Sequence, residues 1–312
     1  MNQMPQSELK GAGVTGQSSV LQRDRTAEDI RTDEGFQTVQ KPYDKRRLSY
    51  AGTFSNPFKR LVIRLVEWAT AKVQILRVIR QFEARGIPAG QAFWAQALEI
   101  MGITVTTPAE EIARIPATGP LVIVANHPHG LVDGMVLAEV IGRVRGDYKI
   151  LTRNLLTGLP EIAQFMIPVP FAHEPNAREE GLKMRADAML HLKRGGCIVL
   201  FPAGSVAASD SFFGPVVEKE WNPFTAKMVA RSKAQVLPVR FPTHNSRLYQ
   251  IANQLSATLR QSLLLYEIRA AFHKPQRPII GHVKQPDEMA EALGNPRQWL
   301  ADMREETLSL RG

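Results

Sequence analysis

The chain has 312 residues, of which 44% are hydrophobic and 22% are charged, with 22 glycines, 21 prolines and one cysteine. This composition fits a globular protein with an ample core and excludes collagen, low-complexity and disulfide-scaffold classes. The formal net charge is +9. Cys197 has no partner for an internal disulfide, so nothing in the fold requires an oxidising compartment.

Residues 1–40 are rich in Gln, Ser, Thr, Gly and acidic residues and show no apolar periodicity. They predict a disordered tail. The start of the chain lacks a basic region followed by an apolar stretch, so we expect no signal peptide.

Residues 41–88 predict a basic helical arm, because residues 41–85 hold eleven Lys and Arg against three acidic residues. One helix is expected over 57–85, between Pro57 and Gly86. Its apolar residues share one face: Phe58, Leu61, Val62, Leu65, Ala69, Val73 and Leu76.

Charged side chains recur along this helix every few residues, which disfavours a membrane span. Two interpretations remain. The helix lies in the interface of an anionic membrane, with Phe58 and Trp68 among acyl chains, or it packs its apolar stripe on the domain. A nucleic-acid partner suits the arm less well, because few aromatic residues are interleaved with its charges.

Residues 89–312 alternate helical and strand patterns, which predicts an α/β domain with a mixed, largely parallel sheet flanked by helices. Helices are expected over 92–101, 132–144 and 178–193. Strands are expected over 121–125, 148–152, 197–201, 236–241 and 278–283.

The loop after the first of these strands contains a possible catalytic pair. His127 lies at the strand end, and Asp133 follows about one helical turn later. An imidazole oriented by a carboxylate can act as a base near neutral pH. The loop has no serine or cysteine nucleophile, so the simplest chemistry is direct attack by a substrate hydroxyl. Alternatives are a solvated or helix-capping histidine, or a zinc site of His127, His129 and Asp133 that His173 or His244 would complete.

A second loop, 201–205, directly follows another buried strand and reads Phe-Pro-Ala-Gly-Ser. Gly204 would allow close approach of the backbone, and N–H groups here could meet a developing oxyanion. An ordinary strand-to-loop turn is the alternative.

Together these loops resemble the motifs of the glycerolipid (lysophosphatidic acid-type) acyltransferase superfamily, Asn-His followed by Asp, and Phe-Pro-Glu-Gly-Thr. The likeness is greater to the haemolysin-like and lyso-ornithine-lipid acyltransferase branch, which has Asn-His-Pro-x-Gly-x-x-Asp-Gly and Phe-Pro-Ala-Gly. Residues 244–248 and 259–267 also look like that branch, and the resemblance covers roughly residues 50–285.

The resemblance implies that His127 is the base and Asp133 its orienting partner. It implies an acyl thioester donor, on acyl carrier protein or coenzyme A, with no metal, no cofactor and no covalent intermediate. Pro238 and Val239 match the last motif, near the donor pocket. The residues expected to bind substrate are Asn126, Arg153, Phe201, Pro202, Gly204 and Ser205.

Two departures from the superfamily pattern bear on the site. His127 and Asp133 are separated by five residues instead of the common four, so His129 is an alternative base. Ala203 stands where Glu is common and no Arg follows Ser205. This favours a lyso-aminolipid acceptor, such as lyso-ornithine lipid, over lysophosphatidic acid.

The expected function is therefore a peripheral O-acyltransferase at the cytoplasmic face of the inner membrane, acting on a lyso-lipid. The alternatives are a thioesterase or lysophospholipase that uses the same pair, or a non-catalytic haemolysin-like membrane-binding protein.

Overall fold

The computed structural model describes Ser49, Ala51 and residues 56–152, 159–170 and 176–312. The expected tail 1–40 and the start of the basic arm lie outside the described residues. Among the described residues, the domain contains a six-stranded sheet with the order β3-β2-β4-β1-β7-β8. Its strands are β1 (Leu121–Ala125), β2 (Tyr148–Thr152), β3 (Met166–Pro168), β4 (Cys197–Leu200), β7 (Gln235–Arg240) and β8 (Ile279–Ile280).

All neighbouring strands of this sheet run parallel except β7 and β8. The register aligns Leu121 with both Cys197 and Gln235. As a result, β1, β4 and β7 end at the same edge of the sheet, where parallel α/β sheets form their sites.

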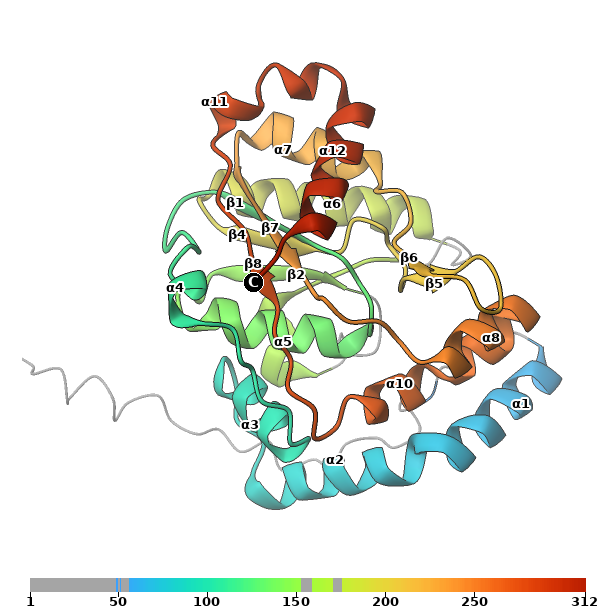
Figure 1. The fold of residues 1–312 in the computed structure, drawn as a ribbon. Coiled ribbons are helices and arrows are strands. Elements are labelled where there is room, and N and C mark those ends of the chain that lie inside the picture. The colour runs from blue at the N-terminus through green and yellow to red at the C-terminus, as the bar shows by residue number, and fades with distance from the viewer. Residues whose placement is uncertain (1–48, 50, 52–55, 153–158, 171–175) are drawn as a thin grey trace, which may run out of the picture. The chain divides into compact units, whose positions relative to one another are not determined.

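Helices cover both faces of the sheet (Figure 1). One face of β1, with Leu121 and Ile123, packs on α3 (Ala92–Ile100) and α5 (Leu131–Gly142). The other face, with Val122 and Val124, packs on α6 (Ala177–Lys193), α7 (Pro223–Ser232) and α12 (Pro296–Ser309). Strands buried on both faces consist of uninterrupted apolar residues, as β1 does. The predicted fold class is confirmed.

The predicted helix 57–85 is present as α1 (Pro57–Glu67), a π-helical turn at Trp68–Lys72 and α2 (Val73–Arg85). The Asn56 side chain accepts hydrogen bonds from two backbone N–H groups of the first turn, and Gly86 (φ 83°) ends the helix. No helix in the described part of the chain is long and apolar enough to cross a membrane.

This helix packs through an unexpected face. It buries Ile63, Glu67, Ala71 and Ile75. Of the predicted apolar stripe of α1, Phe58, Leu61 and Leu65 are exposed, with Phe58 71% exposed, and Val62 is half-buried. The interpretation that this stripe packs on the domain is therefore wrong for α1. The tertiary contacts of the neighbouring face decide the packing, with Val66 against the cluster of Tyr249 and Leu263. The boundaries at residues 40 and 88 stay predictions.

The predicted strand 278–283 is much shorter, because β8 pairs with β7 only at Ile279 and Ile280. No helix was predicted after β7. The remaining elements are α4 (Ala109–Ile112), a 3-10 helix at Pro160–Phe165, β5 (Ala208–Ser209), β6 (Val216–Val217), α8 (Arg247–Leu255), α9 (Ala257–Ser262), α10 (Leu264–Ala270), α11 (Pro286–Met289) and a 3-10 turn at Ala292–Gly294.

Candidate active site

The two loops singled out in the sequence meet at the carboxyl edge of the sheet. One follows β1 and the other follows β4, and these strands are neighbours. The rings of His127 and Phe201 stack with their centroids 3.9 Å apart and their planes 22° apart. The stacking holds one face of the His127 ring and brings both loops into one site.

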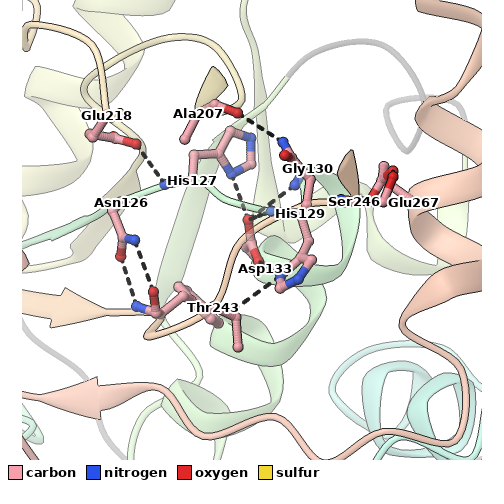
Figure 2. Close-up of polar contacts among 12 residues, drawn as sticks. Asn126, His127, His129, Gly130, Asp133, Ala207, Glu218, Thr243, Ser246 and Glu267 are labelled. Carbon is pink, nitrogen blue, oxygen red and sulfur yellow. Dashed lines mark hydrogen bonds and ion pairs between the residues drawn. The ribbon is translucent and has the colours of Figure 1, made fainter. Parts of the chain in front are cut away.

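Asp133 is the centre of the hydrogen bonding in this site (Figure 2). Its Oδ2 lies 3.0 Å from Nδ1 of His127 and accepts the backbone N–H groups of His129 and Gly130 at 2.8 and 3.0 Å. Its Oδ1 lies 3.3 Å from Nδ1 of His129. The local fold creates this arrangement, because Asp133 sits in the first turn of α5, where a carboxylate is stabilised by free N–H groups and the helix dipole.

Asp133 is fully buried, and burial alone would raise its pKa. The hydrogen bonds from His127 and His129 outweigh this effect, so the pKa of Asp133 lies below its usual value. For His129, burial acts in the opposite direction and would lower the pKa. The hydrogen bond and the charge of Asp133 outweigh this effect and raise the pKa of His129 above its usual value. The site therefore holds an ionised carboxylate between two imidazoles.

His129 has further polar neighbours from the segment after β7. The hydroxyl of Thr243 lies 3.4 Å from its Nδ1. Nearby, the carboxylate of Glu267 accepts the backbone N–H of Ser246 at 3.0 Å and its hydroxyl at 2.5 Å. The negative charge of Glu267 also contributes to the raised pKa of His129. Residues 244–248 and 259–267, noted in the sequence, are thus joined to each other beside the site.

The 201–205 loop forms a turn in which the N–H of Gly204 donates to the carbonyl of Phe201 at 2.9 Å. Gly204 has φ +65°, and a Cβ there would meet no atom within 4 Å. The backbone conformation favours glycine, and the space beside it is open. The hydroxyl of Ser205 is buried and makes no hydrogen bond within the described part of the chain. Its hydrogen-bonding capacity is unused although the atom is buried, and the N–H of Gly204 is engaged in the turn.

The side chain of Asn126 connects β1 to the end of β7. Its Nδ2 donates to the carbonyl of Phe241 at 3.0 Å, and its Oδ1 accepts the N–H of Phe241 at 2.7 Å. A substrate-binding role for Asn126 would require one of these bonds to open. Pro238 and Val239 lie in β7 next to β1, where Val239 aligns with Ala125.

Two residues that were not predicted from the sequence hold the backbone of His127. Ala207 donates its N–H to the His127 carbonyl at 2.9 Å, and the carboxylate of Glu218 accepts the His127 N–H at 3.3 Å. Both belong to the segment around β5 and β6 (Figure 2). Nothing local marks Glu218 in the sequence, since it stands among other charged residues far from the His127 motif.

Glu218 is buried, and one of its carboxylate oxygens has no hydrogen-bond partner in the described structure. Burial raises the pKa of this carboxyl group, although the N–H of His127 partly offsets the effect. The Arg304 guanidinium donates to the backbone carbonyl of Glu218 and holds this segment against α12.

Two residues predicted to bind a ligand, Arg153 for the substrate and His173 for the zinc alternative, lie outside the described residues. Within the described ranges, no three His, Cys, Asp or Glu side chains are grouped so as to hold a metal ion. The side chains proposed for the zinc alternative instead contact each other, with both histidines on Asp133.

The chain has known relatives. The family model described as "Acyltransferase" matches residues 58–270. The chain is 28% identical over 148 residues to the lyso-glycine lipid O-acyltransferase of Bacteroides thetaiotaomicron, covering 47% of this chain and 52% of that protein. It is 25% identical over 144 residues to the protein of the same name from Phocaeicola vulgatus, covering 46% and 49%. The chain thus spans about half the length of the curated relatives it matches.

Among solved structures, the 1-acyl-sn-glycerophosphate (LPA) acyltransferase PlsC from Thermotoga maritima aligns with a TM-score of 0.41 and 13% sequence identity. This alignment covers 81% of the chain and 98% of the PlsC chain.

Proposed function

The chain belongs to the acyltransferase family, and on that premise we propose that it is an O-acyltransferase working at a membrane surface. It moves a fatty acyl group from a thioester of acyl carrier protein or coenzyme A to the hydroxyl of a lyso-lipid. The single observation that carries this proposal is the contact of His127 with buried Asp133, in a site built from two strand-end loops.

The contact with Asp133 determines which ring nitrogen of His127 is protonated. A carboxylate only accepts hydrogen bonds, so Nδ1 carries the proton, and Nε2 keeps the lone pair that a base needs. Asp133 also stabilises the imidazolium that forms when Nε2 takes a proton.

The reaction then follows in one addition and one elimination. Nε2 of His127 removes the proton of the acceptor hydroxyl while the hydroxyl oxygen attacks the thioester carbonyl carbon. The tetrahedral oxyanion collapses, the C–S bond breaks, and the leaving thiolate takes the proton from His127. The thioester is already activated, so the protein mainly positions the hydroxyl, moves the proton and stabilises the oxyanion.

His129 is the weaker candidate for the base. Its raised pKa keeps it protonated over a wider pH range, and a protonated imidazole cannot accept a proton. Its backbone N–H and ring both contact Asp133, which suits a role in holding that carboxylate. The Phe201 contact belongs to His127, which favours His127 as the reacting residue.

We propose a lyso-aminolipid as the acceptor. Ala203 in place of Glu and the absence of Arg after Ser205 support this choice, and the matched relatives are named lyso-glycine lipid O-acyltransferases. Ser205 has a buried hydroxyl without a hydrogen-bond partner, so its predicted role in substrate binding would require this loop to move. Roles for Arg153 in acceptor binding and for Pro238 and Val239 near the donor remain predictions.

The exposed stripe of the arm supports a membrane surface as the working place. Leu61, Leu65 and Trp68 are each more than half exposed, and Lys59, Arg60 and Arg64 are exposed on the same helix. Apolar side chains left in solvent beside cations are typical of a helix that lies in an anionic lipid interface. We propose a peripheral position at the cytoplasmic face of the inner membrane.

The test is a transfer assay with labelled palmitoyl thioesters of acyl carrier protein and of coenzyme A. The acceptors are lysophosphatidic acid, lyso-ornithine lipid and lyso-glycine lipid. The variants are His127→Ala and, as a matched control, His282→Ala. His282 is exposed and follows the antiparallel strand β8, toward the Val236 end of β7 and away from the site.

Label in a two-chain aminolipid with the wild type and with His282→Ala, but not with His127→Ala, is the expected result. Transfer to lysophosphatidic acid alone would contradict the acceptor assignment. Release of free fatty acid with every acceptor would replace the transferase with a thioesterase or lysophospholipase. Binding to vesicles without turnover of either donor would leave a non-catalytic membrane-binding protein.

A further inference from the structure

The exposed apolar side chains of this protein are concentrated on a few neighbouring elements. In the described part of the chain, all large exposed apolar residues except Leu182 and Leu190 belong to the segments 58–73, 212–217 and 248–255. The most exposed is Phe213, at 85%, next to Phe212. These two residues form the tip of the hairpin 207–218, which contains β5 and β6.

Contacts join the three segments, which also lie near one another in Figure 1. Val66 of α1 packs in one cluster with Tyr249 and Ala252 of α8. Arg247, the first residue of α8, donates to the carbonyl of Gly214 in the hairpin tip at 2.9 Å. The exposed residues of α1, α8 and the hairpin therefore belong to one connected part of the molecule.

The hairpin also connects this region to the site. Its first residue, Ala207, bonds to the carbonyl of His127, and its last residue, Glu218, accepts the N–H of His127. The side chain of Asn245, just before α8, donates to the carbonyl of Ala207 at 2.8 Å. The two ends of the hairpin thus lie against His127, the proposed general base, whereas its tip carries two exposed phenylalanines.

We propose that the tip of the hairpin 207–218, at Phe212 and Phe213, inserts into the same anionic lipid surface that α1 binds. This inference rests on the proposed function and extends it to a second contact element. A lipid surface is favoured as the occupant because exposed cations, Arg60 and Arg64 on α1 and Arg247 on α8, stand among the exposed apolar residues. That combination complements anionic headgroups above acyl chains. Two points of contact would present the edge of the sheet, where His127 lies, to lipid substrates.

The lone cysteine of the chain makes a direct test possible. Cys197 is fully buried, and burial raises the pKa of its thiol to about 12, so it reacts poorly with thiol reagents. A Phe213→Cys variant therefore carries a single reactive thiol for an environment-sensitive fluorophore. Leu182→Cys, on α6 and 58% exposed, is the matched control. Both labelled proteins are mixed with phosphatidylcholine vesicles, with and without phosphatidylglycerol.

The expected result is a blue shift of the Phe213→Cys label with phosphatidylglycerol vesicles and no shift of the Leu182→Cys label. In parallel, vesicle flotation compares two double variants. The hairpin variant carries Phe212→Ser and Phe213→Ser, and the control carries Leu182→Ser and Leu190→Ser. The hairpin variant should bind at least about tenfold more weakly, because two phenylalanines lose their apolar burial. The control pair should bind like the wild type.

Equal vesicle binding by the two double variants, or an unshifted label at position 213, would overturn the inference. A shift that depends on protein concentration and needs no vesicles would assign the tip to a second copy of the chain and overturn it as well. No acyl donor or acceptor is present in these assays. Failure of the transfer reaction would therefore count against the proposed function alone, and failure of hairpin binding would leave the transfer result untouched.

Discussion

His127 and Phe201 face each other across two loops that are far apart in the sequence, with ring centroids 3.9 Å apart and nearly parallel planes. The imidazole is thus held from two directions, by Asp133 at its Nδ1 and by the aromatic face of Phe201. A base that is held in this way loses little conformational freedom when the substrate hydroxyl arrives.

Replacement of Phe201 by leucine should loosen the imidazole without unfolding the loop. Leucine keeps most of the apolar volume but removes the flat surface, so we expect kcat to fall on the order of tenfold with little change in stability. Phe165→Leu is the matched control, since Phe165 stacks on Tyr148 at 4.7 Å in another part of the core. Similar kcat losses in both variants would show that the effect comes from general packing and not from the contact with His127.

Asp133→Asn should reduce kcat by about two to four orders of magnitude, because the amide no longer fixes the His127 tautomer or stabilises its cation. The acceptor KM should change little. Steady-state kinetics with each thioester donor would measure both constants. A loss smaller than about threefold would contradict the assignment of His127 and Asp133 as a working pair.

Glu218 should act as a positioning residue for the backbone of His127. Glu218→Gln keeps a side-chain oxygen for the His127 N–H and should retain most of kcat, whereas Glu218→Ala should lose on the order of tenfold. The backbone amide of His127, followed by NMR, should shift mainly in the alanine variant. Glu111→Ala is the control, since Glu111 is also buried and accepts a backbone N–H, that of Ile280 at 2.9 Å. A glutamine variant as impaired as the alanine variant would contradict the role of a hydrogen-bond acceptor.

The pH dependence of stability should differ between the wild type and Glu218→Gln. Because burial raises the pKa of Glu218 in the folded protein, the folded state keeps this proton after the unfolded chain has lost it. Relative to the variant, the wild type should therefore lose free energy of unfolding as the pH rises above about 4.3, the usual glutamate pKa. Denaturant unfolding of both proteins from pH 4 to pH 8 would measure the difference. A difference that grows in favour of the wild type with pH would contradict the sign.

Alanine at two glycines should have opposite effects on stability. Gly204→Ala places a Cβ at φ +65° and should cost about 1–2 kcal/mol, although the space around it is open. Gly134 lies inside α5, where a Cβ would also meet no atom within 4 Å. There alanine should add roughly 0.5–1 kcal/mol through helix propensity. Thermal or denaturant unfolding of the two variants checks both signs.

The sequence alone determined the parts of this protein that depend on short-range patterns. The strand 121–125 and the pairing of His127 with Asp133 were predicted because a strand end and the first helical turn after it lie close together in the chain, and the structure has both features. The family resemblance of the two loops is confirmed by the match over residues 58–270. The largely parallel sheet followed from the alternation of helices and strands.

Only the tertiary structure decided which distant groups share the site. Glu218 and Ala207 hold the His127 backbone, and Phe241 binds Asn126, through contacts that no local pattern in the sequence encodes. The same reason explains the face that α1 buries. Periodicity indicated an apolar stripe, but packing against α8–α10 decided that Ile63 and Glu67 are buried and Phe58 is left in solvent. A helix's own sequence sets which residues share a face, whereas the shape of its neighbours determines which face they cover.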